Sequence, residues 1–352
     1  MGFAGLARLR HGSERRLAVD LGTANTVVYQ RGRGVVAFEP SVVAVDERTG
    51  EVYAVGSDAR RMIGRTPAHI TATRPLRHGV IADFEMAEQM LRYFIRSAAS
   101  KVGGGAEVMV CVPSGVTQVE RSAVVDATRA AGASRAYLIE EPLAAAIGAE
   151  LPVAESVGSL VVDVGGGTSE MAVTALGGMV VSHSVRVGGY DLDDAIVRSI
   201  QDTHRMLVGH EQAERVKIEI GSALEGHAQV AEAEVAGRYM STGMLARIRL
   251  GQDDVRHALE RPLSRIVGAL KELLEQTPAQ LASDIADRGI TLCGGGALLP
   301  GFAELIRRET GLPVSPDPEP LTTVARGAGA ALAELDTLRR SQGRQRSRRG
   351  RR

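Results

Sequence analysis

Two segments of the chain share one pattern of apolar and polar positions. Residues 17–26 read LAVDLGTANT, and residues 160–168 read LVVDVGGGT. Each is a short apolar run that ends in an aspartate, one apolar residue and a glycine-bearing turn, after which a second apolar run begins. Apolar runs on either side of a glycine turn predict a β-hairpin. An aspartate at the same point of both hairpins indicates a duplicated domain, with one site served by both copies.

The predicted hairpin turns have the chemistry of an anion site. Glycine permits a tight turn and the close approach of a ligand, and successive backbone N–H groups form a concave site for phosphate. Asp20 and Asp163 would repel a bare phosphate, so they fit only if a hydrated Mg²⁺ lies between carboxylate and phosphate. Two such hairpins would clamp a nucleoside triphosphate. The alternative is a pair of ordinary hairpins in which Asp and Gly serve only the turn.

The rest of the pattern alternates strands with helices. Three strand-like runs, VVAFEP, SVVAVD and EVYAVG, follow the first hairpin, and Phe84–Ser100 has apolar residues at helical spacing. The buried strands VMVCVP and AYLI are each followed by a helix, the second of which has Pro142 at its first position. The same plan recurs after the second hairpin. This alternation predicts an α/β fold with a partly parallel sheet in each copy.

Composition is typical of a soluble globular protein. The chain has 352 residues, of which 44% are hydrophobic, and this length allows two domains with substantial cores. No apolar segment is long enough to span a membrane, and no signal peptide is recognisable. Cys111 and Cys293 stand alone in apolar runs, which favours buried thiols over a disulfide or a metal site and is typical of a reducing cytoplasm.

The formal net charge of zero conceals an asymmetry. The last fourteen residues contain eight arginines and no acid, which leaves the remaining residues at −8. Without apolar periodicity, residues 338–352 are predicted to be a disordered basic tail. Such a tail either serves solubility or binds anionic lipid headgroups or nucleic acid.

Three further motifs could carry chemistry, and each has a structural alternative. Gly294–Gly296 lie between a strand and a helix, where a glycine turn binds phosphate or merely makes a tight connection. Glu140 and Glu141 precede Pro142, where a carboxylate can orient water or cap a helix. Glu214 and Lys217 are three residues apart on one helical face, so they form a ligand contact or a solvated ion pair. A lysine-bearing P-loop and a dinucleotide fingerprint are both absent from the sequence.

Taken together, the motifs resemble one superfamily in order and type. The chain resembles the actin and heat-shock-chaperone ATPases and, within them, the bacterial MreB/Mbl family of rod-shape-determining actin homologues. The stretches that carry the resemblance run from about residue 17 to 333 and include DLGTANT, CVPSGVTQVER, LIEEPLAAAIGA, VVDVGGGTSEMAV, AERVKIEIGSA and GITLCGGGALL. The resemblance implies an actin-like ATPase fold of two duplicated ribonuclease-H-like domains, each with a small inserted subdomain.

The resemblance also implies a role for each matched position. Asp20 and Asp163 would hold Mg²⁺ through water, and Glu141 would orient the attacking water, with Asp163 and Thr168 also in the catalytic set. The implied nucleotide contacts are Thr23, Ala24 and Asn25 in the first phosphate loop; Gly165, Gly166, Gly167 and Thr168 in the second; Glu214, Arg215, Val216 and Lys217 on the ribose side; and Gly294, Gly295, Gly296 and Ala297 on the adenosine and phosphate side.

The chain departs from the family pattern at three places. Tyr190 follows a glycine pair where these proteins usually have aspartate, with Asp191 next. The loop 97–107 has only Val102 as a sizeable apolar side chain, so its insertion into a membrane is not supported. The third departure is the basic tail. Residues 1–16 offer instead a short, weak amphipathic anchor, or else a disordered leader.

From these features we expect an ATP-binding and ATP-hydrolysing filament subunit of the bacterial cytoskeleton that determines cell shape and wall synthesis. The expected cofactors are ATP and Mg²⁺, and the expected partners are further copies of the chain, the inner face of the cytoplasmic membrane, and membrane-bound cell-shape and wall-synthesis proteins. The alternatives are a small-molecule kinase of the same fold and a DNA-partitioning filament. The expected domains are 17–153 with 312–337, including an insertion at 36–69, and 154–311, including an insertion at 191–244.

Overall fold

The computed structural model describes residues 16–99 and 105–334. The chain divides into two compact units. The first contains residues up to Leu151 and from Thr322 onward, and the second contains Pro152–Leu321. The chain therefore returns to the first unit about ten residues later than the expected boundary at 312, because residues 314–316 form a strand that pairs within the second unit. Residues 1–15 of the predicted leader, residues 100–104 of the loop at 97–107 and the basic tail lie outside the described residues.

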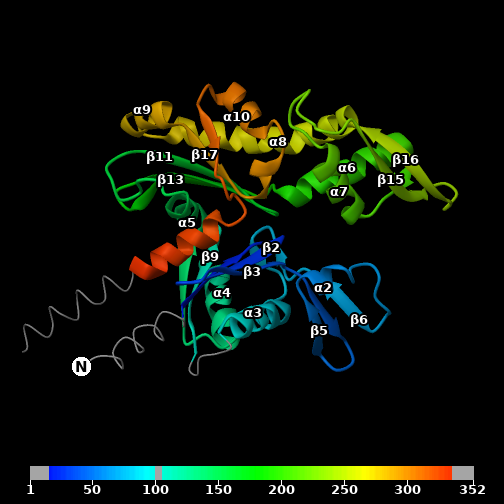
Figure 1. Cartoon of the computed structure of the whole chain (residues 1–352), viewed down its shortest axis with the longest axis horizontal. Helices are drawn as coiled ribbons and strands as arrows, with labels where there is room; N and C mark the ends of the chain where they lie inside the picture. Colours follow the sequence, from blue (N-terminus) through cyan, green and yellow to red (C-terminus); the bar gives the residue numbers. More distant parts are fainter. Residues whose placement is uncertain (1–15, 100–104, 335–352) are drawn as a thin grey trace, which may run out of the picture. The chain divides into compact units, whose positions relative to one another are not determined.

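The first unit is built on a five-stranded sheet with the order β10-β9-β1-β2-β3. Strands β1, β9 and β10 are parallel, and β2 and β3 are antiparallel to their neighbours. Helices α3 and α4 cover one face of this sheet (Figure 1). Its elements are β1 (Arg16–Leu21), β2 (Asn25–Gln30), β3 (Gly34–Pro40), β4 (Val43–Asp46), β5 (Glu51–Val55), α2 (Ser57–Arg60), β6 (Ile70–Thr73), β7 (Leu76–Arg77), β8 (Val80–Ile81), α3 (Phe84–Ala99), β9 (Glu107–Val112), α4 (Gln118–Ala130), β10 (Arg135–Glu140), α5 (Glu141–Gly148) and the helical residues 323–334.

The second unit repeats this sheet in the order β13-β12-β11-β17-β18. Here β11, β17 and β18 are parallel, and β12 and β13 are antiparallel to their neighbours. Its elements are β11 (Ser159–Val164), β12 (Ser169–Ala175), β13 (Gly178–Val185), α6 (Gly189–His204), β14 (Met206–Leu207), α7 (His210–Ile220), β15 (Glu232–Tyr239), β16 (Leu245–Gly251), α8 (Gln252–Gln276), α9 (Ala279–Arg288), β17 (Ile290–Cys293), η1 (Gly295–Leu298), α10 (Phe302–Thr310) and β18 (Val314–Pro316).

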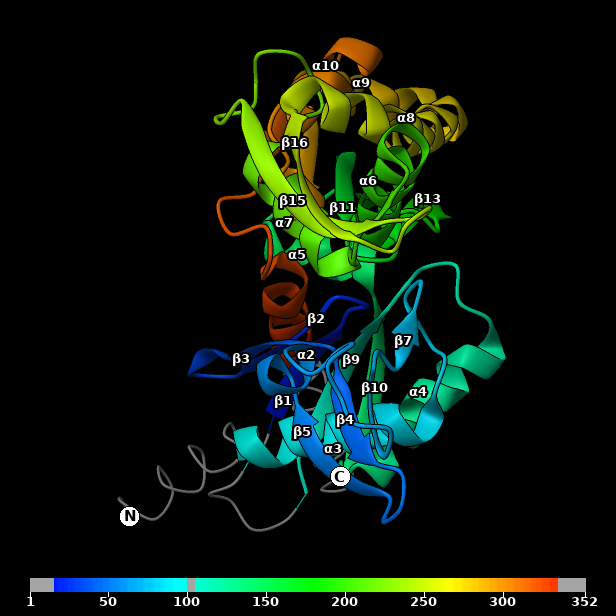
Figure 2. The ribbon, with the colours of Figure 1, turned by 90° about the vertical axis from the view of Figure 1, so that its right-hand side faces the viewer.

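The duplication predicted from the two hairpins is therefore visible in the topology. Each sheet is a three-stranded meander extended by two parallel strands. Each unit also contains a small three-stranded sheet, β5-β4-β6 in the first and β14-β15-β16 in the second. These small sheets reach beyond the expected insertions, to Thr73 and Gly251. In the second unit, β15 and β16 form a long curved hairpin (Figure 2).

The helices form because their apolar residues recur on one face. In α6, Leu192, Ile196 and Ile200 are buried, and in α7 the same holds for Ala213, Val216 and Ile220. These residues join α8 and the strands β11 and β12 in the hydrophobic core of the second unit. The first unit has its own core between α3, α4 and the strands β1 and β9. Each unit thus has a separate core that fixes its own hairpin.

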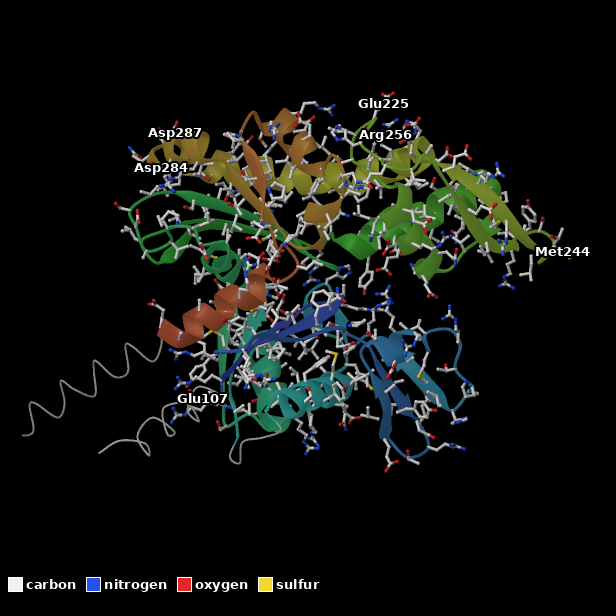
Figure 3. The ribbon with its side chains drawn as sticks, in the orientation of Figure 1. Glu107, Glu225, Met244, Arg256, Asp284 and Asp287 are labelled. Atoms are coloured by element: carbon white, nitrogen blue, oxygen red, sulfur yellow. The ribbon has the colours of Figure 1, made fainter. Side chains whose placement is uncertain are left out.

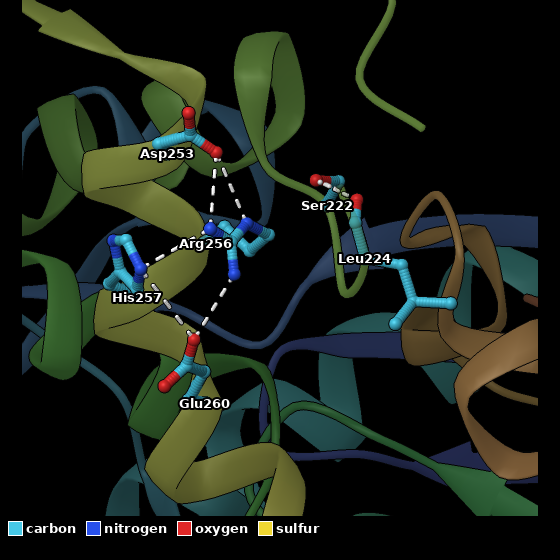
Figure 4. Close-up of polar contacts among 6 residues, drawn as sticks. All are labelled: Ser222, Leu224, Asp253, Arg256, His257 and Glu260. Carbon is cyan, nitrogen blue, oxygen red and sulfur yellow. Dashed lines mark hydrogen bonds and ion pairs between the residues drawn. The ribbon is translucent and has the colours of Figure 1, made fainter. Parts of the chain in front are cut away.

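The long helix α8 carries a surface ion-pair cluster near its start. Arg256 contacts Asp253 and Glu260, each at 3.2 Å, and lies 3.2 Å from the His257 ring nitrogen (Figure 4). Nearby, the Ser222 hydroxyl donates to the Leu224 carbonyl at 2.9 Å. Pairs of this kind between residues of one helix contribute only a few tenths of a kcal/mol, so the buried face of α8 accounts for its position.

Candidate functional site

The first hairpin turn is held by two side-chain hydroxyls. The turn between β1 and β2 begins at Gly22, where a Cβ atom would lie 2.7 Å from the Asn25 carbonyl oxygen. The Thr23 hydroxyl accepts the Gly79 N–H at 2.9 Å. The buried Ser41 hydroxyl donates to the Gly22 carbonyl at 2.6 Å. Glycine is thus required at position 22, and the residues predicted as the first phosphate loop, Thr23, Ala24 and Asn25, form this turn.

The second hairpin turn is held by backbone contacts instead. The Gly165 N–H donates to the Thr168 carbonyl at 2.9 Å, which closes the turn. The N–H groups of Gly189 and Tyr190 then donate to the carbonyls of Gly165 and Gly166, at 3.0 and 2.9 Å. The start of α6 therefore lies directly against the predicted second phosphate loop, Gly165–Thr168.

The unusual Tyr190 does not disturb this helix start. The Asp191 carboxylate accepts the Gly188 N–H at 2.9 Å, which caps the first turn of α6. A Cβ atom at position 188 would lie 2.7 Å from the backbone of Gly165–Gly167. Glycine is thus required at position 188 for the loop contact, a role that the sequence pattern of the glycine pair did not reveal.

Asp163 is buried at the end of β11, with 7% of its surface exposed. It lies opposite Glu170 on one neighbouring strand and opposite Cys293 on the other. Burial first, and the nearby Glu170 second, raise the pKa of Asp163 to about 7, although a hydrogen bond with the Cys293 thiol opposes the shift. A carboxylate in this position gains from a cation beside it. Both cysteines are buried free thiols, as predicted.

Gly294 brings a third segment against Asp163. Its φ of 76° is in the left-handed region, and a Cβ atom there would lie 2.3 Å from the Asp163 Oδ1 atom. The residues after it do not start a regular helix as predicted: Gly295–Leu298 form a single 3₁₀ turn, and α10 begins only at Phe302. The strand end and the glycine turn therefore pack on Asp163, while Ala297 lies within the 3₁₀ turn.

Lys217 reaches from α7 across to α6. Its ammonium lies 2.7 Å from the Asp193 Oδ1 atom and donates to the Gly189 carbonyl at 3.0 Å. Burial raises the pKa of Asp193 to about 6, although Lys217 opposes this shift. Because the same Gly189 contacts Gly165, Lys217 is held beside the second phosphate loop.

The other three residues of the predicted ribose segment have different surroundings: Glu214 lies near Asp193 and contributes to raising its pKa. Val216 is fully buried in the core. Arg215 pairs with Glu219 at 2.8 Å and also donates to the Gln212 side chain at 2.9 Å. The side chains of Val216 and Arg215 thus serve packing and helix-surface contacts in α7, and Lys217 is the member of the segment that the structure links to the loop.

Two neighbouring glutamates at the start of α5 have different environments. Glu140 forms an ion pair with Arg121 of α4. Glu141 is the first residue of α5, directly before Pro142, and only 7% of its surface is exposed. Because β1, β9 and β10 are parallel, Asp20 and Glu141 lie at the same edge of the first sheet.

Asp193 is a functional candidate that no sequence motif indicates. It lies on α6 three residues before the buried Ile196 and seven before the buried Ile200, so it falls on the apolar face of the helix. The sequence does place a carboxylate on an otherwise apolar helix face, and this could have identified Asp193, because a buried charge requires a partner. Ser41 was missed for a different reason, because its contact with Gly22 joins residues 19 positions apart.

Residues 16–99 and 105–334 contain no cluster of side chains that would bind a metal ion without other ligands. No group of three or more His, Cys, Asp or Glu side chains in these ranges could hold a metal ion. Nor does any helix in the described part of the chain have the length and hydropathy needed to cross a membrane. Mg²⁺ commonly keeps several waters and binds through one or two carboxylates beside phosphates, and Asp20 or Asp163 could serve as such a carboxylate.

Comparison with known proteins gives consistent matches over most of the chain. A family model described as MreB/Mbl protein matches residues 14–340. The chain is 50% identical over 326 residues to the cell shape-determining protein MreB of Escherichia coli K12, covering 91% of this chain and 94% of that protein. The solved structure of MreB5 of Spiroplasma citri bound to ADP is 34% identical, with a TM-score of 0.86 and coverage of 91% and 98%. The AMPPNP-bound structure of the same protein is 33% identical, with the same TM-score and coverage of 93% and 98%.

Proposed function

The chain belongs to the MreB/Mbl protein family, and on this premise we propose that it is a cell shape-determining filament subunit that binds and hydrolyses ATP. The predicted family and actin-like fold are confirmed by the family match and by the structural similarity to MreB5. ADP and AMPPNP are bound by that relative, and we extend nucleotide binding to this chain as part of the proposal.

The observation that carries the proposal is the contact cluster around the second phosphate loop. Gly294 approaches Asp163, Gly189 bonds to Gly165, and Lys217 bonds to Gly189. Three segments far apart in sequence thus meet at one glycine turn whose neighbours are a buried carboxylate and a lysine. A phosphate bound by the backbone N–H groups would offset the positive charge of the lysine. A cation beside the carboxylate would offset its negative charge.

The donor set fits Mg²⁺ as a second ligand. Carboxylate oxygens suit this ion, and because burial raises the pKa of Asp163, a cation beside this carboxylate would offset the cost of its charge. Asp20 would contribute from the first hairpin, as it does in the sequence-based expectation. When bound, the ion would neutralise phosphate charge during phosphoryl transfer.

We assign hydrolysis to Glu141. Its carboxylate is positioned by the β10–α5 junction and by Pro142 at the beginning of the helix. Orienting a water molecule needs a fixed oxygen acceptor. The neighbouring Glu140 forms an ion pair with Arg121 of α4.

The proposal also includes filament formation, attachment to the inner membrane face and contact with wall-synthesis proteins. Self-association is supported by membership of the family, and the other two partners rest on the resemblance alone. The two segments that could reach a membrane are the leader and the basic tail, and residues 1–15 and 335–352 lie outside the described residues.

The proposal is tested by nucleotide titration and by pelleting. We expect Asp163→Asn to weaken ATP binding about tenfold in Mg²⁺ and to change it little in EDTA, while Asp58→Asn, a control on an exposed carboxylate, has no effect. The unmodified chain should sediment with ATP and less with ADP, on liposomes and without them. An unchanged ATP affinity of the Asp163→Asn variant in Mg²⁺ would contradict the metal site. No sedimentation under any condition would contradict the filament.

A further inference from the structure

The second unit buries one carboxylate among apolar side chains. Only 1% of the Asp193 surface is exposed, and the other buried residues of α6 include Ile196 and Ile200. By contrast, Glu225 and Asp287 are exposed at the periphery of the unit (Figure 3). Burying a carboxylate costs stability unless a partner compensates its charge. The role of Asp193 therefore follows from the group that it contacts.

That group is the ammonium of Lys217, which reaches Asp193 from α7. The Lys217 Nζ atom lies 2.7 Å from the Asp193 Oδ1 atom and donates to the Gly189 carbonyl at 3.0 Å. An ammonium has three N–H donors, and these are the two protein oxygens that it contacts within residues 16–99 and 105–334. The Lys217 side chain is still 17% exposed. One N–H donor is therefore available to a ligand.

The Gly189 contact places this ammonium beside the second phosphate loop. A Cβ atom at position 189 would lie 3.5 Å from the Lys217 Nζ atom and 3.8 Å from the Gly165 carbonyl oxygen. The Gly189 N–H donates to that same oxygen at 3.0 Å. The lysine and the loop thus meet at one glycine, so a ligand that occupies the loop comes within reach of the available donor.

Asp193 restricts the part of Lys217 that the helix does not fix. The backbone of α7 is anchored by the buried side chains of Val216 and Ile220, whereas a lysine side chain is a flexible stem with many rotamers. The ion pair selects one position for the ammonium before any ligand arrives. A group that is already in place loses less conformational freedom on binding, which strengthens the interaction.

We propose that Asp193 is a positioning residue for nucleotide binding, which holds Lys217 so that its remaining N–H donor meets an oxygen atom of the nucleotide. This inference rests on the proposed nucleotide site and adds to it a residue that acts only through Lys217. A carboxylate beside a phosphate site also repels phosphate. Position and charge therefore have opposite effects on affinity, and the experiment must separate them.

Two substitutions separate position from charge. Asp193→Asn removes the charge but keeps an oxygen acceptor for Lys217, whereas Asp193→Ala removes both. We expect Asp193→Ala to weaken ATP and ADP binding about tenfold and Asp193→Asn to weaken it less than about threefold. Turnover at saturating ATP should fall less than affinity in both variants, because Lys217 acts in binding. Asp194→Ala is the control, since the Asp194 side chain is 42% exposed and should leave both affinities unchanged.

A second background tests whether Asp193 acts through Lys217. In a Lys217→Met chain, Asp193→Ala and Asp193→Asn should bind ATP equally well, because the ammonium that they position differently is gone. Both double variants lack the two buried charges, so they avoid the unpaired carboxylate that Lys217→Met alone would leave in the core. The unfolding temperature of each variant shows whether it is folded under the binding conditions.

Adenosine distinguishes the two sources of the nucleotide oxygen. If Asp193→Ala weakens adenosine binding relative to Asp193→Asn, the donor meets a ribose hydroxyl. If the difference is confined to ADP and ATP, the donor meets a phosphate oxygen. Either result supports the positioning role.

The outcomes also separate this inference from the wider proposal. If the unmodified chain binds ATP and the alanine and asparagine variants bind it equally, the positioning role is wrong while the nucleotide site stands. The role is equally wrong if the alanine variant still binds more weakly than the asparagine variant in the Lys217→Met chain. If the unmodified chain binds neither ATP nor ADP, the nucleotide site itself is refuted, and the inference is refuted with it.

Discussion

The two hairpins have the same place in two sheets of the same strand order, but they differ in what surrounds their aspartates. Asp20 is half-buried and lies opposite Val27. Asp163 is buried and lies opposite a second carboxylate, Glu170. The second copy thus concentrates negative charge in a buried place, whereas the first presents one aspartate at a more open edge. Duplication preserved the scaffold, and the electrostatics of the two copies diverged.

The contrast extends to the last strand of each sheet. In the first copy, β10 is followed by Glu141-Pro142 and the helix α5. In the second, β18 is followed by Asp317-Pro318, and the Asp317 carboxylate accepts the Glu319 N–H at 2.8 Å in a turn. Both carboxylates are buried. The one in the second copy closes a turn, so we expect water positioning to depend on the first copy alone.

The largest effect should come from removing one carboxylate of this pair. Glu141→Ala should lower ATP turnover about a thousandfold with nucleotide affinity retained, because an oriented acceptor for water is lost. Asp317→Ala should keep turnover within about threefold and should destabilise the fold by about 1 kcal/mol, since a turn cap is removed. Phosphate release and equilibrium nucleotide binding measure both. Similar turnover in the two variants would refute the assigned division of roles.

The features that could be predicted from sequence are those that local patterns determine. Apolar runs and glycine turns located both hairpins, and Pro142 marked the start of α5. The helical spacing in Phe84–Ser100 matched α3 to within one residue. These signals are local because hydrogen bonding and side-chain direction repeat every two or four residues.

The remainder depended on contacts between distant segments. Spacing gave Lys217 a partner three residues away, whereas its ammonium lies beside Asp193 on another helix. The 3₁₀ turn after Gly294 arises where Gly296 packs on Val164, a contact that no local pattern records. The unit boundary after Leu321 depends on the pairing of β18 with β17. In each case the partner is fixed by packing, which a single sequence does not display.

The next effect concerns how buried charge in the second copy responds to pH. Burial raises the pKa of Asp193 to about 6 from 3.8, so the folded chain binds this proton more tightly than the unfolded chain does. Unfolding releases that proton between about pH 4 and 6, and stability therefore falls as pH rises through this range. The free energy of unfolding of Asp193→Asn, minus that of the unmodified chain, should rise by about 3 kcal/mol over this range.

Urea unfolding at a series of pH values measures this difference. The groups that face Asp193 are Lys217, Glu214 and His210. Asp194→Asn is the matched control, because Asp194 is the adjacent carboxylate, is 42% exposed and contacts His210 at 3.2 Å. A flat difference for Asp193→Asn, or an equal slope for the control, would show that burial of Asp193 does not control the response.

The smallest effect distinguishes the two turns by their tightness. A Cβ atom at Gly22 would lie 2.7 Å from the Asn25 carbonyl oxygen, whereas at Gly165 it would lie 3.3 Å from the Thr168 carbonyl oxygen. The first contact forces backbone movement, and the second requires a shift of a few tenths of an ångström. Gly22→Ala should therefore cost about 2 kcal/mol and Gly165→Ala about 1 kcal/mol or less. Urea unfolding of both variants measures the two free-energy costs. If Gly165→Ala costs as much as Gly22→Ala or more, the backbone-held turn of the second copy does not accommodate a Cβ atom more easily than the first turn.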